Sequence, residues 1–215
     1  HIDGSWGKCD PREKKNLRSR CCALITTKSS QTLIDTSPDL RGQLVKAKIK
    51  KIDRVIYSHM HADQTHGINE LRVFYLNKKK KIEIFADLKT RKYLLDSFSY
   101  CFKENADYPA TLNLNKVKKV LIFGKKESKI KIKCIPVKHG SINALSFIIN
   151  NKLAYASDVS HIFSKDMKYF HKLEYLVIDC LRLNKHSSHY CLKEILEIVK
   201  IINPKKTVLT NMHSD

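Results

Sequence analysis

A ten-residue stretch, 58–67 (SHMHADQTHG), constrains this chain more than any other segment. It follows the apolar run 52–57 (IDRVIY), whose short length and β-branched residues predict a strand buried in a sheet. Two histidines one residue apart, His59 and His61, leave the end of that strand and can direct both imidazoles at one metal ion. Asp63, two residues further on, offers a hard oxygen ligand to a second ion. The stretch therefore predicts a metal site rather than a polar loop with incidental histidines.

The pattern His-x-His-x-Asp-His after a strand resembles the signature of the metallo-β-lactamase-fold hydrolases. His59, His61 and Asp63 match it, while Gln64 stands where that family usually has a further histidine. Later matches follow in the family's order: His139 in IPVKHG, Asp158 in LAYASD and His213 in LTNMHSD. The segments WGKCDP, LIDTSPDLR, GINELR and HSSHYCL are similar to the branch that contains PhnP-like cyclic-phosphate phosphodiesterases. The resemblance covers nearly the whole chain and implies an α/β fold, a four-layer αββα sandwich of the metallo-β-lactamase type.

The resemblance also implies a site for two divalent metal ions. His59, His61 and His139 would hold the first ion through three imidazoles and leave a position open for water. Such a set suits Zn²⁺, which lowers the pKa of a bound water to about 7. Asp158 would bridge to the second ion.

The second ion's site departs from the family pattern at two positions. Gln64 offers only a neutral carbonyl oxygen, and Asn211 stands where close relatives have a histidine, two residues before His213. Two altered ligands favour a rearranged site, although a weak or absent second metal is the alternative. The expected ligands are Asp63, Asp158 and His213, with His66 or Gln64 completing the set. A set so rich in oxygen would also accept Mn²⁺.

The segment LRLNKHSSHYCL contains the candidate proton donor. Relatives have a histidine that is not a ligand just before this helix, and His189 aligns with it better than His186 does. A histidine titrates near pH 6.5, which suits general-acid catalysis at neutral pH. The predicted catalytic residues are His189, as the proton donor, and the metal-site residue Asp63.

These residues predict a metal-dependent hydrolase that cleaves a phosphodiester by attack of a metal-bound hydroxide, with a cyclic sugar or nucleotide phosphate as the leading substrate. Two alternatives stay open. One is an RNA- or DNA-processing nuclease of the same superfamily. The other is a non-catalytic binding protein in which the changes at Gln64 and Asn211 are losses.

The formal net charge of +20 suits a polyanionic or phosphorylated partner. The basic residues are 33 lysines and only 8 arginines, mostly scattered or in short runs that commonly form solvated faces or turns. We expect a phosphorylated small molecule as substrate and no membrane partner. Nucleic acid and a second copy of the chain, as a homodimer, are left open.

Length and cysteine usage bound the organisation of the chain. A chain of 215 residues, 42% hydrophobic, predicts one hydrolase domain over residues 1–215. It begins at His1 rather than Met and stops at Asp215, so we expect native segments to be missing at both ends. Seven cysteines without a CxxC pair predict reduced, mostly buried thiols in a cytoplasmic protein.

Hydrophobic patterning predicts alternating strands and helices. The expected strands are 22–26, 32–35, 54–57, 82–86, 120–123, 129–137, 144–150, 152–157, 175–179 and 206–210. The expected helices run from a cap at Asp39 to Lys48 and over 68–77, 88–100 and 190–201. Residues 103–118 predict a loop, and Asn150 with Asn151 predicts a hairpin turn.

Overall fold

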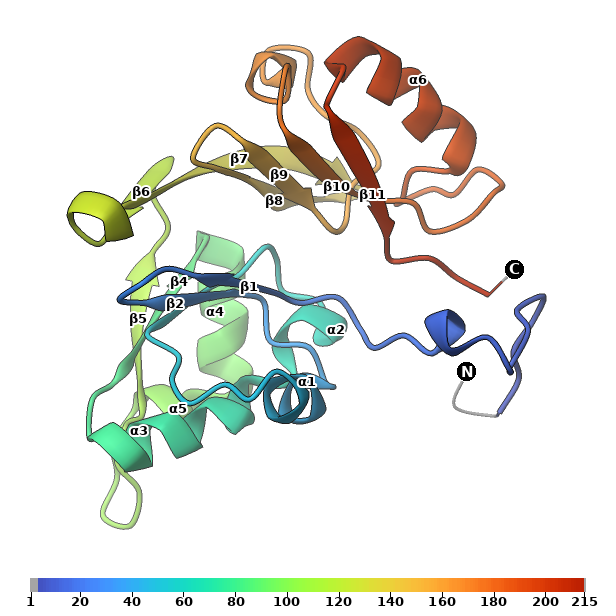
Figure 1. Ribbon diagram of the computed structural model, residues 1–215. Coiled ribbons are helices and arrows are strands. Elements are labelled where there is room, and N and C mark those ends of the chain that lie inside the picture. Colours follow the sequence, from blue (N-terminus) through green and yellow to red (C-terminus); the bar gives the residue numbers. More distant parts are fainter. Residues whose placement is uncertain (1–3, 215) are drawn as a thin grey trace. The chain divides into compact units, whose positions relative to one another are not determined.

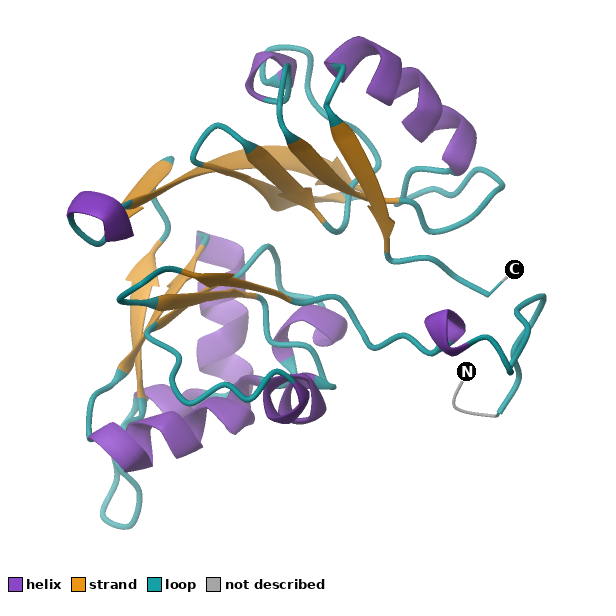
Figure 2. Ribbon diagram, in the orientation of Figure 1, coloured by secondary structure: helices purple, strands orange, loops and turns teal. Residues whose placement is uncertain are grey.

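The structure, a computed structural model, describes residues 4–214 (Figures 1 and 2). These residues divide into two compact units: a central unit, Arg20–Cys134, and a terminal unit that joins the segment up to Ser19 with the chain from Ile135 onward. The single domain expected from the length stays a prediction. Within residues 4–214, none of the helices has the length and apolar character that crossing a bilayer requires.

The strands form two mixed sheets, ordered β1-β2-β3-β4-β5 and β11-β10-β9-β8-β7-β6. The strands of the first sheet are β1 (Ala23–Thr26), β2 (Gln31–Ile34), β3 (Arg54–Ile56), β4 (Ile82–Ala86) and β5 (Leu112–Lys116). Those of the second are β6 (Val120–Phe123), β7 (Ile130–His139), β8 (Ile142–Ile149), β9 (Leu153–Ala156), β10 (Tyr175–Asp179) and β11 (Lys206–Thr210). The α-helices are α1 (Leu40–Lys46), α2 (Ala62–Thr65), α3 (Arg72–Lys78), α4 (Leu88–Ser97), α5 (Ser99–Phe102) and α6 (Leu192–Ile202). Short 3₁₀ helices are η1 (Lys14–Asn16), η2 (Ile68–Leu71), η3 (Lys126–Ser128) and η4 (Met167–Tyr169).

The central unit packs its helices on a largely parallel sheet, in which β2, β3, β4 and β5 pair in parallel and only β1 is antiparallel. Leu40 of α1, Phe74 of α3 and Leu94 of α4 are buried in one cluster with apolar residues of β2, β3 and β4. Burying these apolar side chains is the main free-energy gain that holds the helices on the sheet.

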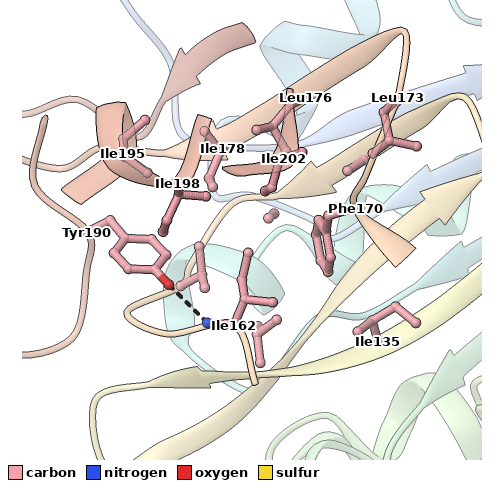
Figure 3. Close-up of a cluster of buried hydrophobic side chains, with 14 of the residues drawn as sticks. Ile135, Ile162, Phe170, Leu173, Leu176, Ile178, Tyr190, Ile195, Ile198 and Ile202 are labelled. Atoms are coloured by element: carbon pink, nitrogen blue, oxygen red, sulfur yellow. Dashed lines mark hydrogen bonds between the residues drawn. The ribbon is translucent and has the colours of Figure 1, made fainter. Parts of the chain in front are cut away.

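The terminal unit has its own core, under helix α6 (Figure 3). Ile195, Ile198 and Ile202 recur at helical spacing and pack with Leu176 and Ile178 of β10. Tyr190, just before the helix, is buried in the same cluster, and its hydroxyl accepts a hydrogen bond from the backbone N–H of Ile162 at 2.9 Å. This contact ties the loop that precedes α6 to the loop that follows β9.

The structure contradicts the predicted loop over residues 103–118, because residues 112–116 form strand β5 beside β4. The strand sequence LNLNK was missed because asparagine and lysine have low strand propensity. The side-chain amides of Asn113 and Asn115 donate hydrogen bonds to the carboxylate of Glu83 on β4, at 3.0 and 2.7 Å. These cross-strand hydrogen bonds stabilise the pairing of β5 with β4, an effect that strand propensity does not include.

Several helix boundaries also differ from the prediction. The helix expected over 68–77 begins as the 3₁₀ turn η2, and the helix expected over 88–100 breaks at Phe98, where φ is −133°. Asp39 makes no side-chain cap; its carboxylate instead accepts the backbone N–H of Arg20 at 2.7 Å. The hairpin turn is confirmed, since Asn150 and Asn151 both have positive φ, as a type I′ turn requires.

Candidate metal centre

Three predicted site residues lie together in the terminal unit. His139 is the last residue of β7, Asp158 follows β9, and His189 lies in the loop before α6. One ligand atom from each lies within 4.8 Å of the others. The rings of His139 and His189 meet edge to face, with centroids 4.7 Å apart. His139 and Asp158 are each only 4% exposed, so both side chains are largely shielded from water.

The orientation of His139 is fixed by a backbone carbonyl. Its Nδ1 lies 2.8 Å from the carbonyl oxygen of Ser188. A carbonyl oxygen only accepts, so Nδ1 carries the proton and Nε2 keeps its lone pair for a ligand. The approach depends on Gly140, which has φ +56° and whose added Cβ would lie 2.8 Å from the Cβ of Ser188. Glycine tolerates both the positive φ and the close approach of Ser188, because it has no Cβ.

His189 is held by a buried carboxylate. Its Nδ1 lies 2.5 Å from Oδ2 of Asp179, the last residue of β10. The Asp179 side chain is fully buried. The same oxygen accepts the backbone N–H of Val159 at 3.0 Å. Burial raises the pKa of Asp179 above its ordinary value, although the hydrogen bond and charge of His189 act in the opposite direction. Because Nδ1 is committed to Asp179, Nε2 of His189 is the nitrogen that remains for a proton or a ligand.

Asn211, at the end of β11, contacts the cluster. It has φ +59°, and its side-chain amide donates to Oδ1 of Asp158 and to the carbonyl of Ser157, both at 3.3 Å. His213 donates its backbone N–H to the carbonyl of Leu181 at 2.8 Å. Within residues 4–214, His213 contributes no ligand atom to the cluster of His139, Asp158 and His189.

The central unit carries the other two predicted imidazoles of the first ion's site. His59 is 1% exposed, and its Nδ1 lies 3.0 Å from the hydroxyl of Ser58. The rings of His59 and His61 lie edge to face, with centroids 4.5 Å apart. Asp35, at the end of β2, has φ +62°, and its carboxylate accepts the backbone N–H of Ser58 at 2.7 Å. This bond fixes Ser58, the first residue of the segment 58–61 that carries both histidines, here called the histidine loop.

The remaining predicted ligands lie on or beside the short helix α2. The side-chain amide of Gln64, which is fully buried, donates to Oδ2 of Asp63 at 3.2 Å. His66 is exposed; its Nε2 lies 2.9 Å from the hydroxyl of Tyr93 and its ring packs against Phe98. Of the two candidates for completing the second ion's site, Gln64 therefore contacts Asp63 and His66 contacts helix α4.

The residues of the terminal cluster fit a divalent metal ion. The imidazole of His139 and the carboxylate of Asp158 are donors that Zn²⁺ accepts, and Mn²⁺ accepts the carboxylate oxygen; His189 beside them is the predicted proton donor. Metal-binding histidines usually donate their second ring nitrogen to a carbonyl or carboxylate, as His139 does to Ser188, and Asp179 holds His189 in the same way. The cluster thus has both the ligand atoms and the supporting groups of a metal site.

Asp179 and Asp35 are supporting residues that the sequence analysis did not assign to the site. Each ends an apolar strand, in YLVID and QTLID. An aspartate at the end of an apolar strand is the available signal, and Asp179 also lies one loop before the histidines of HSSHYCL. Such residues also commonly serve as salt-bridge partners, so the sequence alone does not assign them to the site.

Comparison with known proteins identifies the family. The family described as "Beta-lactamase superfamily domain" matches residues 31–212. A new diphosphatase from the PhnP family, known from its crystal structure, is 26% identical in sequence to this chain. The match covers 96% of this chain and 80% of that chain, and the two structures superpose with a TM-score of 0.86. Human tRNase Z, short form, is 18% identical, covers 96% of this chain and 90% of that chain, and has a TM-score of 0.71, which supports the fold alone.

A curated relative is an octanoyltransferase of Porphyromonas gingivalis, 26% identical over 208 residues, which are 95% of this chain. The chain spans 41% of the length of that protein. The two mixed sheets with their helices, together with the family match, confirm the predicted α/β fold of the metallo-β-lactamase type. The chain therefore belongs to the β-lactamase superfamily, and it is similar to PhnP-family proteins within it.

Proposed function

We propose that this chain is a metal-dependent hydrolase that cleaves a phosphodiester, with a cyclic sugar or nucleotide phosphate as the leading substrate. The observation that carries the proposal is the cluster of His139, Asp158 and His189. Asp179 holds His189 in place through a hydrogen bond. Similarity to a PhnP-family diphosphatase and membership of a hydrolase-rich superfamily support it.

The metal would be held by the predicted ligands: His59, His61 and His139 for the first ion, with Asp158, Asp63 and His213 and either Gln64 or His66 for the second. When bound, such ions supply a nucleophile from water at neutral pH and neutralise charge on phosphate oxygens. Zn²⁺ suits the imidazole-rich set and Mn²⁺ the oxygen-rich set.

His189 would transfer the proton that the leaving oxygen needs. Asp179 accepts a hydrogen bond from Nδ1–H and fixes the ring, so the exchangeable proton is the one on Nε2. The Ser188 carbonyl holds His139 beside it, so both rings keep a defined separation. An alkoxide leaving group depends on this proton, whereas p-nitrophenolate is a weak base and leaves without it.

A second candidate is hydrolysis of a diphosphate, that is, of a P–O–P anhydride. It is favoured by the similarity to a protein described as a diphosphatase. The same proton donor and metal ligands would act on either substrate, because both reactions displace an oxygen from phosphorus.

The experiment compares leaving groups in the metal-loaded protein and its His189→Ala variant. Turnover of a five-membered cyclic sugar phosphate should fall about 10²- to 10⁴-fold in the variant, the usual contribution of a general acid. Turnover of bis(p-nitrophenyl) phosphate should fall much less, and the metal content should be unchanged. His161→Ala, an exposed histidine of the same unit, is the matched control and should change neither rate.

Three outcomes would change the proposal. Equal losses on both substrates would contradict proton donation by His189. Loss of bound metal would make His189 a ligand. Turnover of a dinucleoside diphosphate without turnover of either diester would replace the leading substrate with the second candidate.

A further inference from the structure

A second feature lies in the central unit, away from the histidine loop. We define the lysine hairpin as residues 116–133, which comprise the last residue of β5, the link to β6, strand β6, the turn with η3 and the first residues of β7 (Figure 1). It contains eight lysines and one glutamate, a net charge of +7 in 18 residues. The lysines are Lys116, Lys118, Lys119, Lys125, Lys126, Lys129, Lys131 and Lys133.

The one acidic residue of the hairpin is already engaged. Glu127 forms an ion pair with Lys28, in the turn between β1 and β2. That turn is also approached by Lys51, whose Nζ donates to the carbonyl of Ser29 at 2.6 Å. Lys28 therefore cancels the single negative charge of the hairpin, while Lys51 is itself paired with Asp53 at 3.7 Å, so the excess positive charge is that of the hairpin's own lysines.

The strand register places lysines on one face of the hairpin. Ile122 pairs with Lys131 and Val120 with Lys133, whereas Leu121, Ile130 and Ile132 are buried. Successive side chains of a strand point to opposite faces, so Lys131 and Lys133 lie on the face opposite the buried isoleucines. Ile122 on this face is 55% exposed.

Protection of a sheet edge does not account for this pattern. Proteins commonly place lysines on an edge strand to prevent pairing with other chains. Here the strand at this edge of the six-stranded sheet is β6, whose sequence, VLIF, has no charged residue. The lysines lie instead on the neighbouring strand β7 and in the segments that flank β6.

We propose that the lysine hairpin binds the phosphate backbone of nucleic acid without reading its sequence. Lysines bind phosphates as point charges and release condensed counterions, which drives non-specific association. Residues 116–133 contain no Arg, Asn or Gln, the side chains that most often read base edges. An anionic membrane is a poorer fit, because the face exposes Ile122 as its only large apolar side chain among the described residues. The inference is independent of the hydrolase activity proposed above.

Fluorescence anisotropy with a labelled 20-nucleotide uridine RNA tests the proposal, measured across a series of salt concentrations. The hairpin variant replaces four lysines with glutamine: Lys118, Lys129, Lys131 and Lys133. The control variant removes the same charge from exposed lysines of the terminal unit: Lys193, Lys200, Lys205 and Lys206. The hairpin variant should bind at least about 10-fold more weakly, and its log–log salt slope should be smaller by about 3, at about 0.7 for each lost contact. The control variant should bind within about 2-fold of the unmodified chain.

Equal weakening in both variants would show a diffuse charge effect and overturn the proposal, as would failure of the unmodified chain to bind RNA at low salt. Phosphatidylserine vesicles are the second probe. Loss of vesicle binding with RNA binding retained would assign the hairpin to a membrane surface instead. If the fourfold variant fails to fold, Lys118→Gln with Lys129→Gln, two exposed positions, should still reduce the salt slope by about 1.4.

Discussion

At the scale of single residues, the site depends on groups that hold its imidazoles. Asp179→Asn removes the charge that fixes His189 through Nδ1 while keeping the size of the side chain. Loss of such a supporting partner typically costs 10- to 100-fold in activity or metal affinity. We expect a loss of that size in turnover of the cyclic phosphate, with a smaller loss on bis(p-nitrophenyl) phosphate. Asp96→Asn, at an exposed position, is the control.

Equal rates for Asp179→Asn and the unmodified chain would contradict the role of Asp179. A uniform loss on both substrates, accompanied by a lower free energy of unfolding, would make Asp179 a structural residue only.

The sequence predicted His139, Asp158 and His189 as site residues, and the structure brings these three together. It could not predict the partners, because Asp179 and Ser188 reach the imidazoles through the order of strands rather than through spacing along the chain. In the sequence, Asn211 is only a departure from the ligand pattern. Only the structure shows that its amide contacts the carboxylate of Asp158.

At the scale of the elements, the position of His139 depends on the turn between β7 and β8, which requires glycine at residue 140. Gly140→Ala should lower the free energy of unfolding by about 1–2 kcal/mol, the cost of a left-handed conformation for a residue with a Cβ. The close approach to Ser188 should add to this cost and displace the carbonyl that holds His139. Urea denaturation measures the change.

Gly42→Ala is the matched control for this substitution. Gly42 lies in helix α1, and an added Cβ would meet no atom within 4 Å. Alanine is favoured over glycine in a helix by up to about 1 kcal/mol, so this variant should be equally stable or more stable. Equal stability of Gly140→Ala and the unmodified chain would contradict the account of the turn.

Element prediction from the sequence succeeded where apolar residues follow a clear period. The bounds of β4, β6, β10 and β11 are those predicted from the apolar runs. Strand β5 was missed because its stability comes partly from bonds between Asn115 and Glu83 on the neighbouring strand, which no local pattern reveals. The break at Phe98 was missed because the residues on both sides of it are compatible with a helix.

At the scale of the whole molecule, buried thiols predict how stability depends on pH. Burial raises the pKa of Cys22 and of Cys134 from 9.0 to about 12. Above pH 9 the unfolded chain releases thiol protons that the folded chain retains, so the free energy of unfolding falls as pH rises from 9 to 12. The contribution is fully present below pH 9.

Urea midpoints at pH 8 and pH 10.5 measure this effect. The midpoint should be lower at pH 10.5, and the decrease should be smaller in Cys134→Ala, which lacks one of the two thiols. An identical decrease in both proteins would show that other groups cause it.

Metal content, measured in parallel with turnover, tests whether this chain is a metal-dependent hydrolase. The protein would be purified without chelator, its Zn²⁺ and Mn²⁺ counted per chain, and its hydrolysis of bis(p-nitrophenyl) phosphate assayed before and after metal removal. We predict two divalent ions per chain, turnover that disappears with the metal and returns on adding it back, and loss of both in His139→Ala. No bound ion and no turnover after adding either metal would contradict the claim and favour a binding protein.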